Sequence, residues 1–321
     1  MAYTTIDDSS AHFQSLRWTG NDTGQGARDF TFTGNSNMQP DMALGIIENN
    51  QVARMVTDSS RSWSNGNKEW SWNGANIEGD TNAINTGAYG WLGPGLTNGI
   101  RMSQAGNYWN VNNKPYYAAC WKVNGGTTTS FSESGSNPGG TRQTNSTAGM
   151  SIITYTGTGS NGTIGHGLGV APSWVLCKDR DGTGVWVTWQ NTLAGNQALE
   201  LQSTNAAANE PTSWNSTVPS STVFSVGTRG GTNASSTDFV AYCFAEKQGY
   251  SKFGKYTGNG NADGPFVYTG FKPAWVMIKR TDGANGWTIF DNKRDPFNIV
   301  GNQLTVNIDG AEEGDAAHHA E

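Results

Sequence analysis

One pattern of residues occurs twice in this chain at the same spacing. A Tyr-Thr-Gly triplet is followed by a proline 17 residues after the tyrosine (172 − 155 and 273 − 256), then by a tryptophan, a lysine, an Asp-Gly pair and a second tryptophan. The two sets are Tyr155, Pro172, Trp174, Lys178, Asp181-Gly182 and Trp186, and Tyr256, Pro273, Trp275, Lys279, Asp282-Gly283 and Trp287. Six landmarks at identical spacing indicate that both segments share one fold.

A more distant copy opens the chain. Trp18-Thr19-Gly20 takes the place of the triplet, and Pro40-Asp41-Met42 takes the place of the proline and first tryptophan. The closing segments match as well, since the runs 116–121 and 239–244 both hold a cysteine at the same position, Cys120 and Cys243. We therefore expect three diverged copies, with these cysteines buried and reduced in the last strand of their copies and not bridged to each other.

The local pattern of each copy favours short antiparallel strands. Trp174 to Cys177 and Trp275 to Ile278 are apolar runs too short for helices, and Val223 to Val226 resembles them. The Asp-Gly pairs predict hairpins with turns that need a positive φ. The chain has 43 Gly, 11% aromatic and only 14% charged residues, a composition typical of strands and tight turns. The predicted fold is all-β: tandem antiparallel β-sandwich, jelly-roll-like repeats with little helix.

The boundaries of the repeats follow from the same landmarks. We predict a first β-sandwich repeat over residues 1–123, with an inserted Trp-rich loop over 59–90. A Gly/Ser/Thr-rich linker is expected over 124–148, a second repeat over 149–248 and a third, incomplete repeat over 249–321.

Charge and hydropathy disfavour several classes of partner. The formal net charge is −6 and there is no basic run, which argues against nucleic-acid binding. No stretch approaches the roughly 20 apolar residues that insert into a membrane. The first residues carry Asp7 and Asp8 and no apolar core, so we expect synthesis in a host cytoplasm without a signal peptide. The three cysteines, an odd number, include Cys177 and do not suggest a disulfide framework.

The residues that could carry catalysis or hold a metal have plainer explanations. His166 lies in a Gly-rich turn, Gly165-x-Gly167-x-Gly169, which lacks the spacing and the following helix of a phosphate site. Asp179 to Gly184 lacks the further oxygens of a calcium loop. The other histidines are His12, His318 and His319, and the carboxylates considered for glycoside hydrolysis are Glu69 and Glu78. We expect no catalytic residue, no metal and no cofactor, and hence no enzyme.

Five tryptophans in the first copy lie among Asn and Gly, where exposed aromatic rings would suit stacking on a sugar or docking onto a protein. These candidate glycan- or partner-binding residues are Trp63, Trp70, Trp72, Trp91 and Trp109. The alternative is that most of them pack within their own sheet. For Trp174, Trp186, Trp275 and Trp287 we expect a structural role in the repeats.

Segments of the second and third copies resemble a known family. The residues that carry the resemblance are Phe239 to Glu246, Gly249 to Gly254, Tyr256 to Gly260, Asp263 to Phe271 and Pro273 to Arg280, with the opening Met1 to Asp8. They are similar to a domain of undefined function in structural proteins of marine phages, especially cyanophages, often found near concanavalin-A-like jelly-roll modules. The resemblance is close over 150–298 and loose over 1–123. It implies a virion location and supplies no catalytic or binding residue.

These observations leave more than one function open. The first hypothesis is a non-enzymatic virion structural protein (tail fibre, appendage or head-surface component) that assembles with other virion proteins and forms a homo-oligomer. The second is a lectin-like, receptor-binding adhesin for host surface glycans. A glycan hydrolase is a distant third.

The third copy is expected to lack its closing strand. The second copy takes 88 residues from Tyr155 to Cys243 (243 − 155), and the same count from Tyr256 reaches past Glu321. An uncovered sheet edge invites pairing, so we expect a neighbouring chain, or another segment of this chain, to complete the sheet. The alternatives are a truncated form of a longer protein and a sheet that closes in a shortened form.

Overall fold

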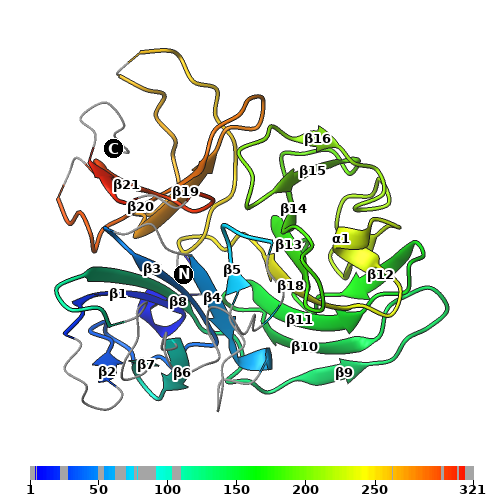
Figure 1. Ribbon diagram of the computed structural model, residues 1–321, viewed down its shortest axis with the longest axis horizontal. Helices are drawn as coiled ribbons and strands as arrows, with labels where there is room; N and C mark the ends of the chain where they lie inside the picture. Colours follow the sequence, from blue (N-terminus) through cyan, green and yellow to red (C-terminus); the bar gives the residue numbers. More distant parts are fainter. Residues whose placement is uncertain are drawn as a thin grey trace.

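The computed structural model describes residues 4, 6–21, 28–49, 54–61, 70–75, 78, 92–102, 110–261, 263–297, 300–308 and 311–314. The fold is all-β, with every strand pair in these residues antiparallel and only short helical turns such as α1 (Gly230–Asn233). Each of the three repeats contributes one large sheet, and the sheets are arranged around a common centre (Figure 1).

The first repeat is a two-sheet sandwich. The strands of its large sheet, in spatial order, are β1 (Phe13–Thr19), β8 (Pro115–Trp121), β3 (Met42–Ile47), β4 (Met55–Asp58) and β5 (Trp70–Ser71). Its small sheet consists of β2 (Arg28–Thr31), β7 (Gly99–Met102) and β6 (Leu92–Leu96). An apolar cluster that includes Trp18, Met38, Ile100 and Cys120 fills the space between the two sheets.

The second repeat has the same plan with a wider sheet. In spatial order its eight strands are β16 (Ala208–Asn209), β15 (Gln197–Glu200), β14 (Val187–Gln190), β13 (Trp174–Asp179), β18 (Asp238–Phe244), β11 (Met150–Thr156), β10 (Gly140–Asn145) and β9 (Thr129–Phe131). The small sheet pairs β12 (Gly162–Gly165) with β17 (Val223–Val226).

The prediction that 124–148 is a linker is wrong. Strand β10 pairs along β11 from Gly140↔Tyr155 to Asn145↔Met150, and β9 pairs with β10. Both strands extend the edge of the second large sheet, where one face meets solvent and polar residues are tolerated. Their Thr, Ser and Asn content therefore resembles that of a linker although both strands pair within the sheet.

The third repeat contains half of this architecture. Its sheet has the order β19 (Trp275–Lys279), β20 (Trp287–Asp291), β21 (Asn302–Thr305) and β22 (Glu313–Gly314). These strands occupy the positions of β13, β14, β15 and β16 in the second repeat. A long loop without strands joins β18 to β19 (Figure 1).

The registers confirm the repeat in all three copies. The pairs Met42↔Asp58, Trp174↔Gln190 and Trp275↔Asp291 each join residues 16 apart (58 − 42, 190 − 174, 291 − 275). The expected hairpins are present, but the expected turn geometry is wrong, since neither Gly182 nor Gly283 has a positive φ. Instead, Lys178 and Lys279 donate to the carbonyls of these two glycines, at 3.1 and 3.4 Å.

The inner faces of the three large sheets share one apolar core. A chain of aromatic rings with centroids 5.3–6.4 Å apart crosses it from the third repeat to the second. Its members, in order, are Trp275, Trp121, Phe244, Trp174, Trp72, Trp186 and Tyr242. Because each sheet buries its inner face on the others, the repeats are parts of one folded unit.

A closed ring of hydrogen bonds joins the repeats at equivalent positions. The indole Nε1 of Trp186 donates to the Ser71 carbonyl of the first repeat, at 3.0 Å. Trp287 donates to the Glu200 carbonyl of the second repeat at 3.2 Å. Arg54 of the first repeat donates through Nε to the Thr305 carbonyl of the third, at 3.1 Å. The registers of β4, β14 and β20 show that the three donor residues are equivalent to one another in the repeat. The three acceptor residues are likewise equivalent. The repeats are therefore related by an internal pseudo-threefold axis.

The three cysteines are buried and free, as expected. Cys120 lies in β8 and Cys243 in β18, at the same position of their closing strands. Burial raises the pKa of Cys177 to about 12 and raises those of the other two thiols as well, which keeps all three protonated and unreactive.

Candidate interaction surface

The closing strand is the part of the repeat that holds its two halves together. In the second repeat β18 lies between β11 and β13 and pairs with both, and in the first repeat β8 lies between β1 and β3 in the same way. Among the described residues of the third repeat, β19 pairs with β20 alone. Its other edge therefore has no strand partner in the part of the chain that the structure describes, and the N–H and C=O groups of such an edge can pair with an added strand.

Strand β19 is also less buried than its counterparts. All six residues of β13 are buried, whereas all five residues of β19 are half-buried. Trp275 and Met277 pack against the shared core. Val276 and Ile278 alternate with them along the strand and so point to the opposite face, where β12 and β17 provide a second sheet in the second repeat.

The loop before β19 exposes an aromatic residue whose equivalents in the other two repeats are buried. Tyr155 is 2% exposed because its ring stacks on Phe239 of the closing strand, at a centroid distance of 5.1 Å. Trp18 stacks on Tyr116 in the same way, at 5.3 Å. The third tyrosine of this position, Tyr256, is 51% exposed.

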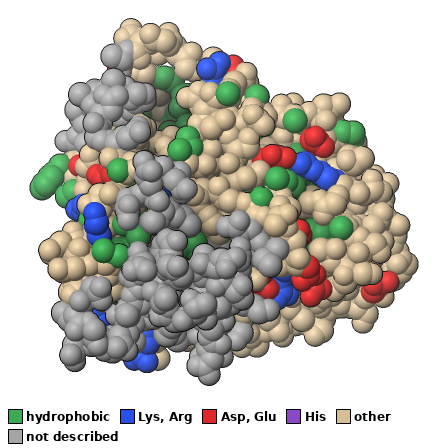
Figure 2. Space-filling model, in the orientation of Figure 1, with side chains coloured by type: hydrophobic (Ala, Val, Ile, Leu, Met, Phe, Trp, Pro, Cys, Tyr) green, Lys and Arg blue, Asp and Glu red, His purple; other side chains and the backbone are tan. Residues whose placement is uncertain are grey.

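Further along the same loop, Phe266 is 89% exposed and Tyr268 is 73% exposed, with Val267 between them. Hydrophobic side chains are visible below this loop in the third repeat (Figure 2). Exposed aromatic rings and a strand edge without a described partner, found together in one repeat, are typical of a surface that another polypeptide covers. We name residues 256–279 the open face of the third repeat.

The structure describes the surroundings of only one of the five candidate tryptophans. Trp72 is 1% exposed and packs edge-on against Trp174 and Trp186 in the shared core. It is a core residue, so the prediction that it binds a glycan or a partner at the surface is wrong. The remaining four, namely Trp63, Trp91, Trp109 and the side chain of Trp70, lie outside the described residues.

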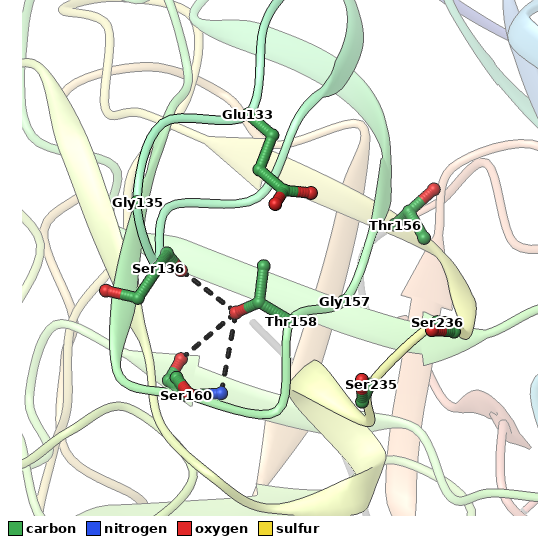
Figure 3. A pocket seen from close by; sticks show the side chains of 9 residues that line it. All are labelled: Glu133, Gly135, Ser136, Thr156, Gly157, Thr158, Ser160, Ser235 and Ser236. Carbon is green, nitrogen blue, oxygen red and sulfur yellow. Dashed lines mark hydrogen bonds between the residues drawn. The ribbon is translucent and has the colours of Figure 1, made fainter.

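A shallow polar pocket lies beside the end of β11 (Figure 3). It has a volume of about 410 Å³ and is lined by Glu133, Gly135, Ser136, Thr156, Gly157, Thr158, Ser160, Ser235 and Ser236. The Thr158 hydroxyl donates to the carbonyl of Ser136 at 2.9 Å, which holds the two sides of the pocket together. The lining offers hydroxyl groups and one carboxylate, Glu133, but no aromatic ring for stacking.

The catalytic candidate Glu78 is part of a buried ion network. It pairs with Arg61 at 3.0 Å and with Arg180 of the second repeat at 2.9 Å. Burial alone would raise the pKa of Glu78, but the two guanidinium groups outweigh it and lower the pKa. Arg61 also pairs with Asp58 at 2.6 Å. Glu78 is therefore held ionised as a link between two repeats, and Glu69 lies outside the described residues.

His166 has a structural environment. Its Nε2 lies 3.1 Å from the Ser220 carbonyl, and its Nδ1 accepts from the Leu168 N–H at 3.2 Å. These bonds select the neutral ring with the proton on Nε2. Burial accordingly lowers the pKa of His166. His12 is also shifted downward in pKa by burial, while His318 and His319 lie outside the described residues.

The Asp179 to Gly184 segment is a turn held by its own side chains. Asp179 accepts from Lys178 at 2.5 Å and from the Gly184 N–H at 3.1 Å. Within the described ranges, no group of three or more His, Cys, Asp or Glu residues is placed to hold a metal ion. No helix in these ranges has the length and apolar character needed to cross a membrane.

Comparison with known proteins places the chain in a family without indicating an activity. A family model described as a domain of unknown function, DUF7483, matches residues 8–321. No curated protein and no solved structure matches the chain.

Proposed function

The chain belongs to the DUF7483 family, whose description names no activity, and we propose that it is a non-enzymatic structural protein of a phage particle that acts through protein–protein assembly. The observation that carries the proposal is the open face of the third repeat. There β19 has one edge without a partner among the described residues, in the same repeat as exposed aromatic residues, and one of these, Tyr256, stands at a position that the other two repeats bury. The location in a virion rests on the resemblance of residues 150–298 to structural proteins of marine phages.

The construction of the molecule supports such a role. The three repeats share one core and are joined by a ring of hydrogen bonds, so the open face is presented by a rigid unit. A rigid surface loses little conformational entropy when it binds a partner. We propose other virion proteins as partners, in a tail fibre, an appendage or the head surface, and a homo-oligomeric arrangement on the particle.

The location is tested on purified particles. Particles from an infected culture are separated on a density gradient, the fractions are examined by mass spectrometry, and intact particles are labelled with an antibody against the recombinant protein. The protein should co-migrate with the major head and tail proteins and should label one fixed site on the particle. Presence in the lysate together with absence from washed particles would contradict the proposal.

The polar pocket favours a second candidate function, a lectin-like adhesin for host surface glycans. Its hydroxyl groups and the Glu133 carboxylate match the hydrogen-bonding groups of a sugar. A glycan array of host envelope polysaccharides tests this function, with Glu133→Ala as the matched variant. Binding that is lost in Glu133→Ala would support the adhesin, and the absence of any binding would leave assembly as the function.

A further inference from the structure

A single absent strand accounts for two separate features of the third repeat. In the second repeat β18 pairs with β13 on one side and with β11 on the other. Without such a strand, β19 keeps an open edge, and the Tyr256-Thr257-Gly258 segment has no partner from which to form the counterpart of β11. Both consequences are observed, since β19 has one neighbour and residues 252–258 form no strand.

In the first two repeats the segment before the closing strand docks on the triplet through an asparagine. Asn233 accepts the N–H of Thr158 at 2.9 Å through its side chain, and its carbonyl accepts the N–H of Gly159 at 2.8 Å. In the first repeat Asn110 accepts the N–H of Asn21 through the same side-chain oxygen, at 3.1 Å. The triplet and the residues after it are therefore a docking site for backbone and amide groups.

The third repeat keeps this docking site. Its sequence Tyr256-Thr257-Gly258-Asn259-Gly260 repeats the pattern Tyr-Thr-Gly-x-Gly of residues 155–159. Gly260 has a φ of +69°, close to the +71° of Gly159. The backbone therefore has the conformation needed for docking, although no described segment of the third repeat lies on it.

The glycine of the Tyr-Thr-Gly triplet lies against the segment before the closing strand in the first two repeats, and the third repeat has no described atom at the same place. A Cβ on Gly157 would lie 2.2 Å from the Ala234 carbonyl oxygen, and a Cβ on Gly20 would lie 2.1 Å from that of Val111. The absence of a side chain thus lets the closing segment approach. A Cβ on Gly258 would meet no described atom within 4 Å.

The two closing segments present in the chain define what fits this space. Each has an asparagine six residues before an aromatic residue (116 − 110 and 239 − 233), followed by Ala, Cys and a second aromatic residue at matched positions. The residues are Asn110, Tyr116, Ala118, Cys120 and Trp121, and Asn233, Phe239, Ala241, Cys243 and Phe244. The first aromatic ring stacks on the tyrosine or tryptophan of the triplet, as Phe239 does on Tyr155.

We propose that the third repeat accepts a β-strand from a different polypeptide, and that this donor carries the pattern Asn-x5-aromatic-x-Ala-x-Cys-aromatic. The strand lies antiparallel to β19, with its last aromatic residue opposite Trp275 and its first aromatic residue stacked on Tyr256. Within residues 1–321 the pattern occurs only at β8 and β18, and both strands already have partners on both edges, so neither strand of a second copy is available as the donor. The inference rests on the proposed assembly function and specifies its partner.

A peptide with the sequence of residues Gly230 to Glu246 serves as the probe, since it contains the asparagine and the closing strand. The peptide carries a fluorescent label and is titrated with the full chain under reducing conditions, with anisotropy as the readout. Saturable binding is expected. The Ala241→Pro form of the peptide should bind at least about tenfold more weakly, because proline removes an N–H and disfavours central strand pairing.

A pair of protein variants locates the binding site. Gly258→Ala should weaken peptide binding by about tenfold or more, because its Cβ would occupy the space of the donor backbone. Gly254→Ala is the matched control, since a Cβ there meets no described atom within 4 Å and Gly254 lies outside the docking triplet. Equal binding of the two peptides, or equal binding to the two variants, would overturn the proposal.

The strand-acceptor proposal and the virion role can fail independently of each other. Failure of the wild-type peptide to bind overturns the donor pattern and leaves the particle location to be judged by the gradient and labelling experiment. Absence of the protein from particles contradicts the virion role, whereas binding that is lost with Ala241→Pro and Gly258→Ala would still establish the third repeat as a strand acceptor.

Discussion

At the scale of single residues, buried polar groups join the repeats. Trp186, Trp287 and Arg54 occupy one repeat position, and each donates to a carbonyl of a neighbouring repeat. An aromatic ring with one N–H performs this role twice and a guanidinium group once. The shared requirement is a donor that crosses to the next repeat, because an unpaired buried carbonyl is costly.

The hydrogen bond from Trp186 can be tested by its removal. Trp186→Phe should lower the free energy of unfolding by about 1–3 kcal/mol more than Trp214→Phe, as expected for an orphaned buried carbonyl. Trp214 is the control because it is buried and its Nε1 has no hydrogen-bond partner in the described structure. Urea unfolding measures both variants. Equal losses would show that the bond to Ser71 contributes nothing.

The two described histidines predict a pH dependence of stability. Burial lowers the folded-state pKa values of His166 and His12 below the ordinary value of 6.5. The unfolded chain then binds more protons, so the free energy of unfolding should fall as the pH drops from 7 to about 5. Urea unfolding across this range should give a smaller pH slope for His166→Gln than for the wild-type chain. An unchanged slope would contradict the neutral, buried ring.

At the scale of strands and turns, equivalent elements have equivalent neighbours except in the third repeat. The triplet glycine shows this most directly. Gly157 and Gly20 lie against the backbone of the segment that precedes their closing strands, while Gly258 has open space. The same element is therefore under a strict steric constraint in two repeats and under none in the third.

Alanine should destabilise the chain at Gly157 and leave its stability almost unchanged at Gly258. Gly157→Ala should lower the free energy of unfolding by about 1–3 kcal/mol, the usual cost of overpacking. Gly258→Ala should be within about 0.5 kcal/mol of wild type, as is usual for exposed sites. Thermal unfolding of both variants is the measurement. A large loss in Gly258→Ala would mean that a segment of this chain already occupies the site.

Much of this element-scale structure could be predicted from the sequence. The spacing of Trp174 and Trp275 from their neighbours predicted the strands, the hairpins and the position of Cys243 in a closing strand. The segment of strands β9 and β10 resembles a linker in sequence because these two strands, at one side of the sheet, carry Thr, Ser and Asn in place of an apolar alternation. The role of Trp72 and the hydrogen-bond ring depend on contacts between repeats far apart in the chain, for which the sequence carries no local signal.

At the scale of the whole molecule, the three sheets form one core. Trp121 connects the repeats within this core, with its ring 5.7 Å from that of Trp275 and 6.2 Å from that of Phe244. One residue of the first repeat thus contacts both of the others. Units that share a core in this way unfold together.

The shared core predicts a single unfolding transition for the chain. Trp121→Ala should move that one transition to lower temperature, with a loss of about 3–5 kcal/mol, typical of a large side chain deleted from a core. Differential scanning calorimetry measures the number of transitions and their positions. Two separate transitions, only one of which moves in Trp121→Ala, would show that the repeats are independent domains.

We propose the open face of the third repeat as the surface through which the protein assembles. The most direct test is a cryo-electron microscopy map of the protein in its particle, at a resolution that separates strands. We expect a strand from another chain running antiparallel along β19, with an aromatic side chain against Tyr256. A bare β19 edge with Tyr256 in solvent, or a strand from the same chain at that position, would contradict it.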